Sequence, residues 1–60
     1  MSKLEKRMRE VGVWDSELAE LMGRKTRGVE ERRREGIHSM GVAVKYAKHL
    51  ACKPIKILED

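Results

Sequence analysis

Residues 15–34 constrain the fold most strongly, because they combine two helical patterns with a turn between them. Leu18 and Met22 recur at the spacing of one helix face and are therefore expected to point toward a core. Gly23 follows directly, and glycine readily adopts the left-handed conformation that ends many helices. The polar segment after it contains one aliphatic residue, Val29. The pattern predicts two short helices joined at Gly23, with the second seated on the core along one edge.

The spacing of Ala19, Gly23 and Val29 is that of a helix-turn-helix. A small residue lets the second helix cross closely, glycine permits the tight turn, and a β-branched residue holds the second helix in place. On these residues the sequence resembles the phage Cro and repressor family of helix-turn-helix DNA-binding proteins. The later stretch VAVKYAKHLACKPIKIL is also similar to that family's fourth helix and the turn after it.

The resemblance implies an all-α fold, a small bundle of four to five helices in which residues 15–34 form the helix-turn-helix and residues 1–60 form one domain. It also implies a Cro-like repressor of a phage or prophage, acting in the bacterial cytoplasm as a homodimer on a double-stranded DNA operator. Two positions depart from the family's pattern: Arg24 replaces a usual aliphatic residue, and Arg32 replaces a usual Trp or Leu. They leave open a protein-interaction module, such as an antirepressor or antitoxin. An excisionase-like protein that bends DNA is a further alternative.

The distribution of charge favours a polyanionic partner. The segment from Arg24 to Arg34 contains six basic and two acidic residues, whereas the rest of the chain holds eight of each. The whole net charge of +4 therefore belongs to this one segment. A concentrated basic patch of this kind is typical of nucleic-acid binding, although a solvated helix face with internal ion pairs would have a similar composition.

Helical periodicity assigns roles to the side chains of the second helix, residues 26–34. With Val29 toward the core, Arg27 and Arg34 lie nearly opposite, so we predict that they contact bases, most naturally guanine. Glu30 and Glu31 either accept from cytosine or orient the arginines. Phosphate contacts are predicted for Ser16, Lys25, Thr26 and Arg33.

Gly28 lies inside this predicted helix, where it costs about 1 kcal/mol relative to alanine. A glycine in that position favours close approach of another backbone. Either a second helix of the chain or DNA would account for it.

The remaining residues predict two more helices and a last short turn. A capping box, S-x-x-E, at Ser2 begins a first helix that Gly12 ends. Its core face comprises Leu4, Met8 and Val11. Asp15 is the expected N-cap of the next helix, with Trp14 as a lid over the core. A helix over residues 40–51 is expected to bury Met40, Ala43, Val44, Ala47 and Leu50, and to turn Tyr46 outward or toward a partner.

Pro54 fits the first position of a last short turn. The apolar residues after it, Ile55, Ile57 and Leu58, either complete the core or form a dimer contact. The alternation in IKIL also allows a short strand, so the sequence leaves helix and strand open for residues 54–58.

The sequence contains little that points to catalysis, a metal or a cofactor. His38, His49 and Cys52 could be imagined as zinc ligands, but paired C-x-x-C motifs are missing, so Cys52 is interpreted as a small core residue. No catalytic triad spacing, phosphate-binding glycine loop or carboxylate pair is present, and a small-molecule ligand is not expected. The single cysteine fits a reducing compartment, and no apolar run reaches membrane-spanning length.

Overall fold

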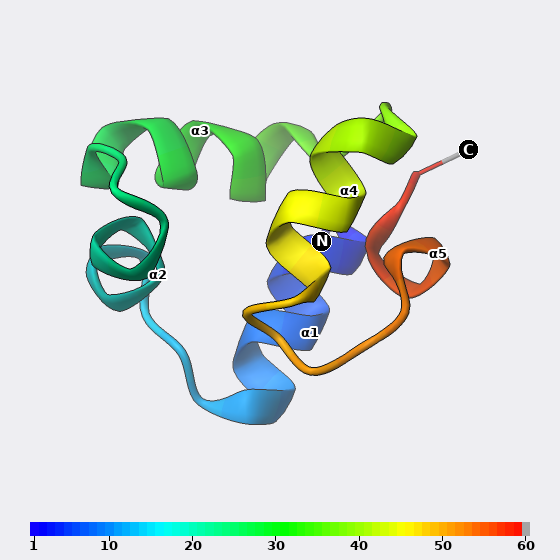
Figure 1. The fold of residues 1–60 in the computed structure, drawn as a ribbon, viewed down its shortest axis with the longest axis horizontal. Coiled ribbons are helices and arrows are strands. Elements are labelled where there is room, and N and C mark those ends of the chain that lie inside the picture. The colour runs from blue at the N-terminus through cyan, green and yellow to red at the C-terminus, as the bar shows by residue number, and fades with distance from the viewer. Residues whose placement is uncertain (60) are drawn as a thin grey trace.

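Five helices account for most of the chain in the computed structural model, which describes residues 1–59 (Figure 1). They are α1 (Lys3–Val11), α2 (Asp15–Met22), α3 (Thr26–Glu35), α4 (Met40–Ala47) and α5 (Pro54–Ile57). Residues 1–59 form no strand, so the all-α class expected from the sequence is confirmed. None of the helices in this range is long and apolar enough to cross a membrane.

The ends of α1 are closed as the sequence predicts. The Ser2 side chain accepts a hydrogen bond from the Glu5 backbone N–H at 3.0 Å, which satisfies one free donor at the start of the helix. The C-terminal end is closed by Gly12 in the left-handed conformation, at φ +71°. Both contacts lie within one turn of a helix end, which is why the sequence alone could predict them.

The start of α2 differs from the prediction. Trp14, and not Asp15, is the N-cap residue, and its backbone N–H donates to the Glu17 carboxylate at 3.1 Å. Asp15 is the first helical residue, which leaves its carboxylate available for a contact with another helix. The prediction that Trp14 covers the core is also wrong. Its side chain is 75% exposed and projects into solvent from the connection between α1 and α2.

One apolar cluster holds all five helices together. Its largest fully buried side chains come from every part of the chain: Leu4, Leu18, Val29, Ile37, Leu50 and Ile57. Met8 and Ala19 are buried as expected, whereas Val11 is more than one-third exposed and does not join the core face of α1. Burial of such side chains contributes roughly 1.5–3 kcal/mol each, so this cluster is the main stabilising feature.

The register of α4 also differs from the prediction. Tyr46 is buried, while Met40 and Val44 are about half exposed. The core stripe of this segment is instead Ala43, Tyr46, Ala47 and Leu50. The helix ends at Ala47, earlier than the predicted end near Ala51. The chain then forms tight turns, in which Ala51 adopts a positive φ.

The C-terminal segment completes the core and is fastened both to Ile37, which follows α3, and to the start of α1. Residues 54–57 form a helical turn with Pro54 at its first position, and Leu58 then makes a single parallel bridge with Ile37. The Glu59 backbone N–H donates to the Ile37 carbonyl at 2.6 Å, and the Glu59 carboxylate accepts from the Lys3 N–H. The segment is therefore a short helix followed by one bridge residue.

Candidate nucleic-acid interface

The turn between α2 and α3 has the geometry that Gly23 predicts. Gly23 adopts φ +66° and ψ +33°, and the Arg24 backbone N–H donates to the Ala19 carbonyl at 2.8 Å. This bond satisfies a carbonyl that the end of α2 would otherwise leave unpaired. The two helices pack on each other, and Figure 1 shows α2 nearly end-on while α3 lies across the view. The chain thus makes a sharp corner between them.

The two sides of α3 differ completely in environment. Val29 has no exposed surface, because it sits in the core. On the other side the Arg27 side chain is 89% exposed and the Arg34 side chain is 65% exposed. The helical spacing predicted this orientation, and α3 presents a cationic surface away from the bundle.

Each of these two arginines is paired with an acid one turn along the helix. Arg27 Nε lies 3.4 Å from a Glu31 carboxylate oxygen, and Arg34 donates a hydrogen bond to Glu30. Exposed pairs at this spacing contribute only about 0.3–0.5 kcal/mol. A phosphate or a base edge could therefore replace either acid at small cost.

The other predicted phosphate contacts, Lys25, Thr26 and Ser16, are exposed, but they lie at the starts of two different helices. Lys25 is the N-cap residue of α3 and Thr26 is its first residue, so both lie at the end where backbone N–H groups are free to bind an anion. Ser16 is exposed on the first turn of α2.

Gly28 is exposed as well, and a Cβ built on it would meet no atom within 4 Å. Close packing against another helix of this chain therefore does not explain the glycine.

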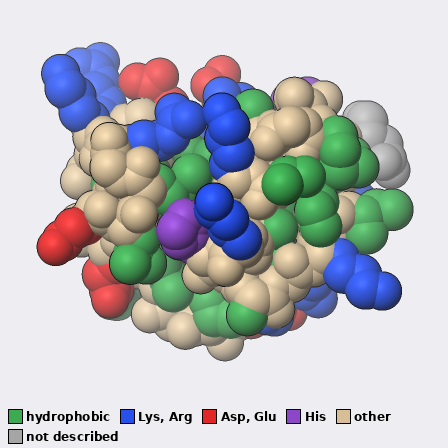
Figure 2. Space-filling view, viewed as in Figure 1, with side chains coloured by type: hydrophobic (Ala, Val, Ile, Leu, Met, Phe, Trp, Pro, Cys, Tyr) green, Lys and Arg blue, Asp and Glu red, His purple; other side chains and the backbone are tan. Residues whose placement is uncertain are grey.

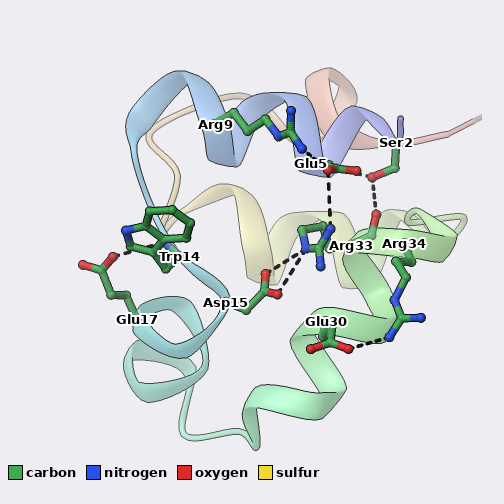
Figure 3. A network of polar contacts seen from close by, with 9 residues as sticks. All are labelled: Ser2, Glu5, Arg9, Trp14, Asp15, Glu17, Glu30, Arg33 and Arg34. Carbon is green, nitrogen blue, oxygen red and sulfur yellow. Dashed lines mark hydrogen bonds and ion pairs between the residues drawn. The ribbon is translucent and has the colours of Figure 1, made fainter.

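Arg33, predicted to contact phosphate, has a different place. Its Nε donates to Asp15 at 2.9 Å and its Nη1 lies 3.4 Å from Glu5, so it joins α3 to both α2 and α1 (Figure 3). The side chain is only 25% exposed. The hydrogen bond to Asp15 raises the pKa of the Arg33 guanidinium above its ordinary value, since the charged form is stabilised. Arg33 therefore ties the helices together, a role that the sequence did not indicate, and its predicted phosphate contact stays a prediction.

A second link reinforces this attachment. The Ser2 hydroxyl donates to the Arg33 backbone carbonyl, and Arg9 donates to the same Glu5 carboxylate at 2.9 Å. The sequence indicated only a capping role for Asp15, and no local pattern relates it to Arg33, because eighteen positions separate them. Glu5 and Asp15 together hold α3 against α1 and α2.

Arg33→Met should destabilise the protein by about 1–2 kcal/mol, because it leaves Asp15 without its partner in a half-buried site. Arg34→Met is the matched control, since Arg34 lies on the same helix and pairs only with Glu30 at the surface. We expect the control to cost less than about 0.5 kcal/mol. Urea unfolding of the two variants measures the difference, and equal losses would contradict the assigned role of Arg33.

A cleft of about 410 Å³ opens beside this network, between α1 and the start of α2. Apolar atoms of Met8, Val13 and Trp14 line it together with four charged residues. Those four, Glu5, Arg9, Asp15 and Arg33, are already paired with one another. The cleft therefore offers a ligand little polar recognition.

The residues expected to form a dimer contact do not share one surface. Ile57 is fully buried and belongs to the core, which corrects its assignment to an interface. Leu58 is half-buried against the same core, and Ile55 alone of the three is exposed, at 69%. Cys52 packs against the core, and residues 1–59 contain no group of three potential metal ligands.

No protein-family model, no curated protein and no solved structure matches this chain.

Proposed function

We propose that the chain is a sequence-specific regulator that binds double-stranded DNA with α3 in the major groove. The observation that carries this proposal is the two-sided α3, with Val29 buried and Arg27 and Arg34 extended into solvent. The major groove is wide enough for an α-helix, and arginine is the side chain that most often reads guanine there. A helix held rigidly on one side can present its arginines without reorganisation.

The charge distribution supports the same partner. The whole net charge of the chain belongs to residues 24–34, which are the end of the turn and nearly all of α3. Basic side chains stand along the upper edge of the molecule in Figure 2, over α3, with acidic ones among them. Long-range attraction to phosphate would therefore bring DNA to the face that carries the reading residues.

In this arrangement Arg27 and Arg34 contact base edges. Lys25, Thr26 and Ser16 contact phosphate, as expected for residues near helix N-termini. Glu30 and Glu31 hold the arginines extended before binding and limit their attraction to DNA of the wrong sequence. The exposed Gly28 lets a sugar-phosphate backbone come close to α3.

The proposed biological role follows the resemblance to Cro and phage repressors. We assign the chain to transcriptional control by a phage or prophage, with repression by occupancy of an operator in the cytoplasm of the host. The corner at Gly23 and the burial of Val29 support this assignment.

Selection of duplexes from a random DNA pool tests the proposal. A mobility-shift titration should first show a shift with random duplex at low salt, and the selected pool should then converge on a guanine-containing motif. With roughly two to four phosphates neutralised per chain, affinity should fall about 10–100-fold between 50 and 200 mM salt.

Absence of any shift at low salt would overturn the proposal and favour binding to an acidic protein surface. A shift without enrichment of any motif would remove sequence specificity. Strong bending of a selected duplex would indicate an architectural role in place of simple occupancy.

A further inference from the structure

Two exposed apolar faces lie at opposite ends of the molecule. We define the α2 face by Trp14 and Leu21, and the α4–α5 face by Met40, Val44 and Ile55; all five side chains are about half exposed or more. Figure 1 has the longest axis horizontal and places α2 at its left end and α4 with α5 toward its right end. Exposed apolar patches on a small protein are typical of interaction sites.

The chain segment that carries each face has charged residues of one sign. Residues 15–22 contain three acids and no basic residue, and Glu17 and Glu20 are both exposed. Glu17 lies between Trp14 and Leu21 on the same side of α2, by the spacing of three and four residues. Residues 40–57 contain four lysines and no acid. All four lysines are exposed, and Lys56 lies 3.8 Å from Glu10.

This pattern argues against a two-fold dimer through either face. A two-fold contact places a surface against its own copy, so glutamates would face glutamates, or lysines would face lysines. Like charges facing each other in an interface are unfavourable, whereas the α2 face of one copy opposite the α4–α5 face of another joins unlike charges. Figure 2 shows acidic side chains at the left end and hydrophobic side chains at the right end, with basic ones beside them.

We infer that copies of this chain associate head to tail, with the α2 face of one copy seated on the α4–α5 face of the next. Leu21 and Trp14 would pack against Val44 and Ile55, and exposed glutamates would meet lysines at the rim. The contact is heterologous, so an assembly of copies keeps one unused face at each of its two ends and can grow there. Neither face includes a residue of α3.

The inference stands without the DNA-binding proposal, since no residue of the α3 outer face takes part. Copies related in this way point in the same direction. If they also bind DNA, they would read directly repeated sequences and not inverted ones.

A pair of complementary variants provides the test. Leu21→Lys places a like charge opposite the lysines, and Ile55→Glu places a like charge opposite the glutamates; both positions are more than 60% exposed. Sedimentation equilibrium without DNA, from micromolar to millimolar protein, should show growing mass for the wild type. Each variant alone should remain a single chain. A one-to-one mixture should associate again, because one variant keeps an intact α4–α5 face and the other an intact α2 face.

Circular dichroism of each variant shows whether the fold is kept, and raising the salt should weaken wild-type association because its rim is charged. If Leu21→Lys still self-associates while Ile55→Glu does not, the contact is a two-fold one through α4 and α5, and the inference is overturned. A wild type that stays a single chain at millimolar concentration overturns it as well. Failure of the one-to-one mixture of the two variants to associate also overturns the inference.

Discussion

Replacing Arg27 and Arg34 together with alanine is expected to weaken binding to the selected duplex about 100-fold or more. An arginine that reads guanine with two hydrogen bonds contributes about 1–3 kcal/mol of discrimination, and two such contacts are removed. The slope of affinity against salt should also fall if either arginine meets phosphate. Fluorescence anisotropy titration of the selected duplex and of a scrambled duplex, at several salt concentrations, measures both effects. The loss should be larger on the selected duplex.

The double variant Lys3→Ala with Lys6→Ala is the matched control. It removes the same charge from α1, where both lysine side chains are exposed. Because charges outside the contact surface are screened, the control should change affinity by no more than about threefold. Equal losses from the two double variants would mean that net charge alone governs binding. The placement of α3 in the groove would then be wrong.

Leu18→Ala is expected to destabilise the protein by about 2–5 kcal/mol, because it removes a fully buried side chain and leaves a cavity. A domain of this length has a total stability of roughly 3–9 kcal/mol, so the variant is expected to be partly unfolded near room temperature. Thermal and urea unfolding measure the loss. The midpoint should fall by about 10 °C or more.

Leu21→Ala, three residues later on the same helix, is the control for this experiment. Leu21 is 61% exposed, and alanine has a slightly higher helix propensity than leucine. The change should therefore alter stability by less than about 0.5 kcal/mol at dilute protein concentration. A larger loss from Leu21→Ala than from Leu18→Ala would show that α2 is rotated relative to the arrangement described.

The elements read correctly from the sequence are those whose signals are local. Ser2, Gly12 and Gly23 close helix ends through contacts within a few residues, so their chemistry alone predicts the boundaries. The orientation of α3 follows equally directly. Val29 is the single aliphatic residue of a highly charged helix, and a period of 3.6 residues then places Arg27 and Arg34 away from the core.

The helical period did not predict which face of α4 is buried, because two overlapping rows of apolar residues both have the spacing of a helix face. Met40 and Val44 lie on one face and Tyr46 and Leu50 on another, and Ala43 and Ala47 lie three or four residues from members of both. Which stripe is buried depends on where α1 and α5 leave space. The structure buries the stripe with the large aromatic ring and leaves Met40 and Val44 half exposed.

Arg33 shows the same limit for charge. Composition counts it with the other arginines of α3, but its partners Asp15 and Glu5 come from α2 and α1. The pairing exists only because the bundle brings three helices together, and no spacing rule relates those positions. The predictions for Trp14 and Ile57 were wrong for the same reason: Trp14 is exposed and Ile57 is buried. The hydrophobicity of a side chain does not say whether the bundle has space for it.

The amino-acid order thus determined where α1 begins and ends, where α2 ends, and that α3 would carry its arginines opposite one valine. Those properties arise from hydrogen bonds and side-chain spacing within a turn or two of helix. Packing between distant segments determined the register of α4, the link from Arg33 to two acids, and the apolar surface left over at each end of the molecule. Those properties depend on shape and volume that exist only after the helices have met.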